Sequence, residues 1–141
     1  MINTIELPCD REGLTQQDRH KLWCSRGEFL ASLGNYAESL VSFDWALAIQ
    51  PEDYMTWLKR GGVLTHLARY TEALVSFERS TTIQPNDQTA LLCQGMVLHH
   101  LGRYQQAYRC YEQVLNNQEP SSFSRLIQIL KKWVYLPKLR K

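Results

Sequence analysis

The chain has 141 residues, of which 44% are apolar and 21% charged, and its formal net charge at pH 7 is +2. This apolar share excludes an intrinsically disordered chain, and no run of about 18 apolar residues predicts a membrane span. The length allows one domain or one repeat array. No CxxC pair occurs, which is typical of free thiols in a reducing compartment. The four cysteines are Cys9, Cys24, Cys93 and Cys110.

A set of special residues recurs along the chain at a spacing of 34 residues. Each set holds a Trp or Leu, then a Gly, then a Tyr that stands two residues after a Gly or Ala. Such a period is typical of repeat proteins, in which each unit packs on its neighbours. The recurring positions are Trp23, Trp57 and Leu91; Gly27, Gly61 and Gly95; Tyr36, Tyr70 and Tyr104; and Pro51 and Pro85.

The period divides the chain into elements that follow one another directly. Residues 1–14 show no helical period, and they lack the basic start and apolar stretch of a secretory signal, which predicts a cytoplasmic protein. Apolar residues at three- and four-residue steps predict two helices in each later unit. The predicted elements are an extended segment (1–14), three helical hairpins (15–53, 54–87 and 88–121), a C-terminal capping helix (122–136) and a basic tail (137–141).

Short polar residues and glycines predict where the helices begin and how closely they pack. Thr15 and Asp18 predict a capping box for the first helix. Asp53 and Asp87 predict N-caps for later helices, because a carboxylate there accepts from free backbone N–H groups. The recurrent Gly lies in mid-helix, where Gly costs about 1 kcal/mol relative to Ala. Close approach of the paired helix explains this Gly better than a hinge does.

These residues resemble the tetratricopeptide repeat (TPR) template, W-x2-L-G-x2-Y followed by Ala, Phe and Pro. Three units cover residues 20–121, and they are similar to bacterial, especially cyanobacterial, arrays. The resemblance implies an all-α, right-handed superhelical solenoid of three helix-turn-helix repeats plus the capping helix. The departures from the template are Arg26, Arg60 and Gln94 in place of Leu, Ser39 in place of Ala, and Leu91 in place of Trp.

The resemblance also implies that the first helix of each unit lines a concave groove that binds a partner protein. Met and Leu at its centre suit a peptide or helix with apolar side chains, since methionines adapt to irregular partners. Two alternatives stay open: some of these residues belong to the core between repeats, or the C-terminal helix itself occupies the groove. The predicted groove residues are Lys21, Cys24, Glu28, Met55, Leu58, Lys59, His66, Thr89, Leu92, Met96, His99 and His100.

One well-known TPR subgroup binds the acidic C-terminus of chaperones through a basic carboxylate clamp. The resemblance places its basic and amide positions at Cys24, Glu28, Lys59, Thr89 and Cys93. Only Lys59 keeps the required chemistry, and Glu28 would repel a carboxylate. The sequence therefore predicts no chaperone-tail ligand.

Metal, cofactor and catalytic patterns are weak. Cys93, Met96 and His100 share a helix face, with His66 one repeat away, but they complete no zinc or copper pattern. No GxSxG, HExxH or phosphate-binding glycine loop occurs. The sequence therefore predicts no metal, no cofactor and no enzyme activity.

Residues 120–141 contain six Lys/Arg and no Asp/Glu, whereas residues 1–119 contain ten Lys/Arg and fourteen Asp/Glu. The basic residues at this end are interpreted as the solvated surface of a capping helix. The alternative is that they bind an anionic membrane surface. Nucleic acid is not favoured as a partner. Trp45 is interpreted as covered by the N-terminal segment, or else as a dimer or partner contact. The residues of the basic tail region are Lys131, Lys132, Trp133, Lys138, Arg140 and Lys141.

Together these patterns predict a non-catalytic adaptor or scaffold that binds a partner peptide or helix in the groove. The alternative is a membrane-peripheral assembly factor, similar to photosystem-assembly proteins, whose basic aromatic tail docks on anionic lipid. Homodimer formation is a further open alternative.

Overall fold

The computed structural model describes residues 13–117, together with residues 126 and 129. Residues 1–12 of the predicted extended segment, most of the capping helix and the basic tail lie outside this part. The two isolated residues, Leu126 and Ile129, are helical and exposed. Residues 13–117 contain helices and turns and no strand. The helices are α1 (Gln16–Ser32), α2 (Tyr36–Ile49), α3 (Tyr54–His66), α4 (Tyr70–Ile83), α5 (Gln88–His100) and α6 (Tyr104–Asn117).

The first helix of each hairpin begins at a side chain that accepts from its free backbone N–H groups. Thr15 and Asp18 form the predicted capping box, and the Thr15 bonds lower the pKa of the Asp18 carboxyl. Asp53 accepts from the backbone N–H of Met55, and Asp87 accepts from that of Ala90. The predicted N-caps are therefore confirmed.

Each hairpin turns at a residue with positive φ that ends its first helix. Gly34 and Gly102 have φ of 78° and 74°, and Ala68 takes the same conformation at 56°. The backbone N–H of Gly34 donates to Ala31 and that of Asn35 to Leu30, a Schellman motif that the other two turns repeat. Glycine adopts this conformation without strain, whereas an alanine there is strained.

The recurrent mid-helix glycines let the two helices of a hairpin approach closely, as predicted. A methyl group at Gly61 would lie 2.5 Å from the Phe77 ring, and one at Gly27 would lie 2.7 Å from the Phe43 ring. Both phenylalanine side chains are almost fully buried. The close approach of helix to ring therefore outweighs the helix-propensity cost of glycine.

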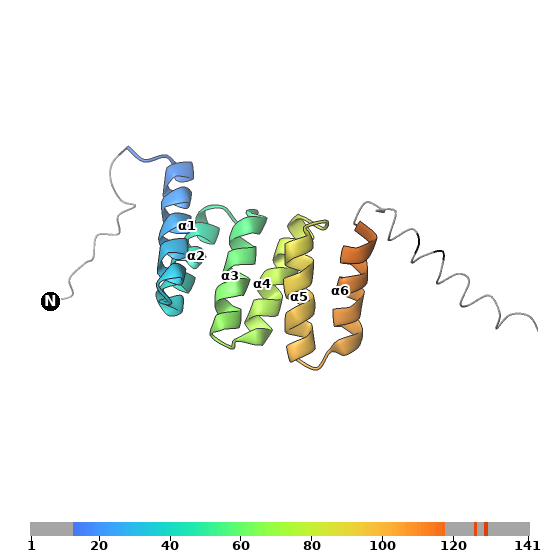
Figure 1. Ribbon diagram of the computed structural model, residues 1–141. Helices are drawn as coiled ribbons and strands as arrows, with labels where there is room; N and C mark the ends of the chain where they lie inside the picture. Colours follow the sequence, from blue (N-terminus) through green and yellow to red (C-terminus); the bar gives the residue numbers. More distant parts are fainter. Residues whose placement is uncertain (1–12, 118–125, 127–128, 130–141) are drawn as a thin grey trace, which may run out of the picture.

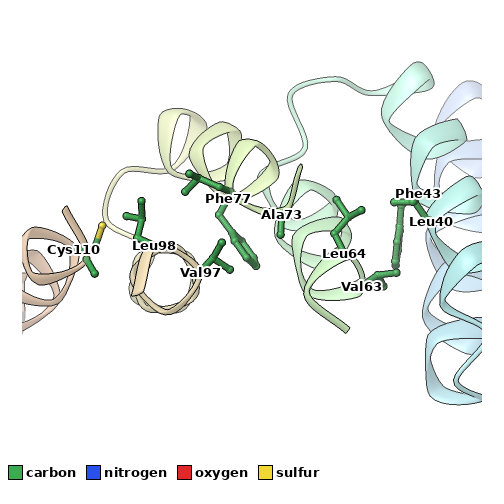
Figure 2. Close-up of a cluster of buried hydrophobic side chains, with 11 residues drawn as sticks. Leu40, Phe43, Val63, Leu64, Ala73, Phe77, Val97, Leu98 and Cys110 are labelled. Carbon is green, nitrogen blue, oxygen red and sulfur yellow. The ribbon is translucent and has the colours of Figure 1, made fainter. Parts of the chain in front are cut away.

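The hairpins stack as a single row from α1 to α6, and the buried core follows that row (Figure 1). Figure 2 shows the buried side chains in a line that begins at Leu40 and Phe43 and ends at Cys110, rather than gathered around one centre. Between successive hairpins, α2 contacts α3 and α4 contacts α5. This architecture confirms the all-α helical repeat fold. In the described part of the chain, no helix has the length and hydropathy needed to cross a membrane.

Candidate functional site

The first helices of the hairpins form the inner wall of the array. α1 contacts α3 and α3 contacts α5, whereas among the described helices α2 does not approach α4 and α4 does not approach α6. A row of hairpins whose first helices lie closer together than their second helices curves towards the first helices. We call the solvent-facing side of α1, α3 and α5 the groove face.

The predicted groove residues lie on these three helices, with different degrees of exposure. Leu58 is half-buried and packs against the core, so it also serves as a core residue, as one of the alternatives anticipated. Cys24 and Lys59 are half-buried as well. The exposed members are Lys21, Glu28, Met55, His66, Thr89, Leu92, Met96, His99 and His100.

The polarity of the groove face changes along the array. In α1 its exposed residues include Lys21 and Glu28, which are charged. In α5 the equivalent positions are Thr89 and Met96, and Leu92 and Met96 are 43% and 55% exposed. The face therefore carries charged side chains in its first repeat, and exposed Leu and Met side chains together with Thr89, His99 and His100 in its third.

A small hollow between α1, α2 and α3 lies at the ionic end, with a volume of about 330 Å³. Lys59 donates to Glu28 across it, which ties α3 to α1. Both side chains keep much of their exposure, so this ion pair contributes at most about 1 kcal/mol. Its main effect is that the Lys59 ammonium already has an anionic partner.

Two of the predicted groove histidines stack on tyrosines of the preceding repeat. The rings of His66 and Tyr36 lie 4.7 Å apart and nearly parallel, and those of His100 and Tyr70 lie 4.9 Å apart. Each tyrosine follows its hairpin turn, so the stack links that turn to the end of the next inner helix. These histidines are therefore held in place by packing before any partner arrives.

A polar cluster that the sequence analysis missed lies where α1 meets the beginning of α3. His20 Nε2 lies 3.2 Å from Asp53 Oδ2 and 3.5 Å from Cys24 Sγ. Thr56 donates to Asp53 Oδ2 at 2.5 Å, and its hydroxyl lies 3.2 Å from Cys24 Sγ. The available signal was the spacing of His20 and Cys24, four residues apart and so on one helix face.

Burial is the main influence on the described thiols. It raises the pKa of Cys24, Cys93 and Cys110 above the ordinary value of 9.0. For Cys24 the hydrogen bond with Thr56 opposes this shift. These cysteines are therefore protonated at neutral pH, which is unfavourable for a nucleophile.

The comparisons with known proteins agree with this geometry. The tetratricopeptide repeat family model matches residues 90–119, which include most of the third hairpin. Two hairpins of the same 34-residue period precede it. Residues 90–119 thus match the tetratricopeptide repeat family, and the described hairpins have the TPR fold. No curated protein matches it.

Several solved structures, two of them named as TPR domains, share this fold at low sequence identity. The second TPR domain of Spaghetti (RPAP3), solved with the HSP90 peptide SRMEEVD, has a TM-score of 0.69 and 18% identity, over 73% of this chain and 97% of its own. The Arabidopsis OM64 TPR domain has a TM-score of 0.71 and 12% identity, over 79% and 93%. MamA has a TM-score of 0.69 and 15% identity, over 70% of this chain and 58% of its own.

Two departures from the TPR template have a structural reason in this array. Arg26 and Arg60 replace the template Leu, and each guanidinium donates at 2.7 Å to a buried serine on the paired helix, Ser42 or Ser76. Each also lies over the Trp of its own helix, at 5.6 and 5.8 Å from the ring centroid. The arginines therefore replace an apolar contact with a hydrogen bond and a cation–π contact.

Trp45 of this TPR chain packs on its own hairpin. Its ring stacks on Trp23 with centroids 5.9 Å apart, and in the second repeat Arg79 lies over Trp57 in the same way. Trp45 remains 47% exposed. The N-terminal segment 1–14 was expected to cover it, and residues 1–12 of that segment lie outside the described part.

Proposed function

We propose that this TPR protein is a non-catalytic adaptor that holds a peptide or helical segment of another protein on its groove face. The observation that carries the proposal is the exposure of large apolar side chains on the inner helices, Met55 on α3 and Leu92 and Met96 on α5. Exposed apolar residues on an inner wall favour a binding surface. Two TPR domains of low identity were solved with a bound peptide, which supports the general proposal that the ligand is a protein segment.

The chemistry of the groove face favours a partner that is apolar at one end. Leu92 and Met96 suit an apolar anchor, and the unbranched Met side chain adapts to irregular shapes. Lys21 and Glu28 at the other end favour a polar or charged extension. We therefore propose an amphipathic segment whose apolar part lies against α5.

We propose further that an acidic chaperone tail is not this partner. The Spaghetti structures contain the HSP90 peptide SRMEEVD, but the groove face here has one basic residue at the predicted clamp positions, Lys59. Its ammonium is engaged by Glu28, which would have to be displaced by a ligand carboxylate. Titration with the peptide SRMEEVD should show no saturable binding, and micromolar affinity would refute this part of the proposal.

The experiment that tests the groove compares Met96→Glu with Val75→Glu. The two side chains have the same exposure, 55%, but Met96 lies on the groove face and Val75 lies on α4, on the outer side. A buried charge without a partner is costly, so Met96→Glu should weaken capture of the natural partner at least tenfold, or by about 1.4 kcal/mol. Val75→Glu should leave capture unchanged, and both variants should keep the helical circular dichroism of the parent. Equal capture by both variants, or loss with Val75→Glu alone, would place recognition outside the groove.

A second candidate function rests on the composition of residues 120–141. Six basic residues without an acid, beside Trp133 and Tyr135, favour binding to an anionic membrane surface. In this alternative the chain is a membrane-peripheral assembly factor. Co-sedimentation with vesicles of anionic lipid should fall as salt rises, and should be lost in Lys131→Glu/Lys132→Glu. Sedimentation that does not exceed that with neutral vesicles would exclude this role.

A further inference from the structure

We propose that His20, Cys24 and Asp53 bind one thiophilic divalent cation, with Zn²⁺ as the best fit, where the first repeat meets the second. In the described part of the chain they are one group of three potential metal ligands whose donor atoms all lie within 4.8 Å of one another. This proposal goes beyond the adaptor function and departs from the sequence prediction of no metal. It also differs from the weak candidate around Cys93 and His100.

The two distances from the His20 nitrogen to the other donor atoms fit a tetrahedral zinc site, and the third pair lies within 4.8 Å. Ordinary zinc bonds to nitrogen, oxygen and sulfur imply a separation of about 3.6 Å between N and S and of about 3.4 Å between N and O. His20 Nε2 lies 3.5 Å from Cys24 Sγ and 3.2 Å from Asp53 Oδ2. Small side-chain adjustments would therefore bring these donors into coordination.

The ligand types also favour zinc over harder cations. A thiolate, an imidazole and a carboxylate are all ordinary zinc ligands, whereas Mg²⁺ and Ca²⁺ prefer oxygen. Binding replaces the proton of the Cys24 thiol with a Zn–S bond and releases that proton to solvent. The thiolate and the Asp53 carboxylate together then balance the charge of the ion.

The surrounding structure holds these ligands in place. His20 and Cys24 lie one turn apart on α1, and Asp53 is the N-cap of α3, with its other carboxylate oxygen bonded to the backbone N–H of Met55. The Thr56 hydroxyl contacts both Cys24 and Asp53, as an outer partner that orients metal ligands does. The Asp53 side chain is 20% exposed, so solvent reaches this ligand, and a water molecule would complete four-coordination.

The equivalent positions at the next junction do not repeat this chemistry. One repeat later, Tyr54 stands in place of His20, Leu58 in place of Cys24 and Asp87 in place of Asp53. The cluster is therefore particular to the first junction and is not required for the TPR hairpin itself. A bound ion there would tie α1 to α3 and so stabilise the first repeat on the second.

Titration of the metal-free, reduced protein with Co²⁺ and Zn²⁺ tests the site. Co²⁺ should give thiolate-to-cobalt absorption in the near ultraviolet with one equivalent bound, and Zn²⁺ should displace it. Cys24→Ser should abolish the absorption, whereas Cys93→Ser, which changes another half-buried thiol, should keep it. His20→Gln should weaken the affinity at least tenfold.

Thermal unfolding supplies a second measurement that does not depend on cobalt. Zn²⁺ should raise the Tm of the parent and of Cys93→Ser, because an ion that binds only the folded state stabilises it, and it should leave the Tm of Cys24→Ser unchanged. Absorption that persists in Cys24→Ser, or an unchanged Tm in the parent with excess Zn²⁺, would overturn the proposal. Neither result bears on partner capture by Met96→Glu, so this site and the groove are tested independently.

Discussion

The two junctions between repeats use equivalent backbone positions but different chemistry. At the first junction, α1 meets α3 through His20, Cys24 and the Glu28–Lys59 ion pair. At the second, the equivalent positions on α3 carry Tyr54 and Leu58, and Leu58 packs against the core. The first junction is thus partly polar and the second is largely apolar, although the two follow the same hairpin geometry.

The difference separates two kinds of position in this TPR array. Residues that recur in each repeat, such as the mid-helix Gly and the ring that packs on it, build the hairpin. Residues that vary, such as His20 against Tyr54, give each junction its own chemistry. The groove face follows the second rule, which is why it exposes charged side chains in the first repeat and Leu92 and Met96 in the third.

The largest effect is expected when the hairpin geometry shared by both junctions is disturbed. In Gly61→Ala the added methyl group would lie 2.5 Å from the buried Phe77 ring, so the variant should lose about 3 kcal/mol of unfolding free energy. The neighbouring Gly62 has open space and serves as the control, and Gly62→Ala should gain about 0.5–1 kcal/mol from helix propensity. Urea unfolding followed by circular dichroism measures both. Equal effects for the two variants would contradict the close-packing explanation.

The next effect compares the N-caps at the two junctions. Asp53→Ala removes an N-cap and the acceptor of the buried Thr56 hydroxyl, so it should destabilise the metal-free protein by about 2 kcal/mol. Asp87→Ala removes only an N-cap bond to Ala90 and should cost about 1 kcal/mol. Thermal and urea unfolding at pH 7 measure the difference. If Asp87→Ala is as destabilising as Asp53→Ala, the polar cluster around Asp53 adds nothing to the stability of the first junction.

A smaller effect concerns the turn of the second hairpin, which supplies a helix to both junctions. Ala68 has φ of 56°, a left-handed conformation that strains an alanine but not a glycine. Replacing Ala68 with glycine relieves this strain, and we expect the gain to outweigh the added flexibility of the unfolded chain. Ala68→Gly should therefore raise the unfolding free energy by about 0.5 kcal/mol. Gly102→Ala, in the equivalent turn, should lower it by a similar amount. Destabilisation in Ala68→Gly would show that the strain is absent.

The smallest expected effect is a loss of folding stability at alkaline pH. It comes from the half-buried thiols, of which Cys24 lies at the first junction and Cys93 at the second. Burial raises the pKa of Cys24 and Cys93. As pH rises past about 9, the unfolded chain loses thiol protons that the folded chain still holds, so the folded state becomes less favoured. Urea unfolding under reducing conditions at pH 7 and pH 10 should show a smaller loss for Cys93→Ser than for the parent. The same alkaline loss in both proteins would contradict a raised thiol pKa.

Sequence patterns predicted the fold well because its signals are local and repeated. These signals act within one hairpin: the Trp or Leu, the Gly and the Tyr of each repeat, the capping box at Thr15, and the N-caps. The identity of the groove residues remains a prediction, although α1, α3 and α5 place most of them on one exposed face. Leu58 shows why exposure was harder to predict: the same helix position faces both the groove and the next repeat.

The amino-acid sequence by itself determined that this chain forms stacked helical hairpins, because a 34-residue period of apolar, glycine and capping residues is satisfied by that arrangement. Only the tertiary structure decided that His20 and Cys24 meet Asp53, and that Lys59 meets Glu28. The physical reason is the sequence separation. These partners lie about 30 residues apart, and their contact depends on how one repeat is set against the next, which local patterns do not encode.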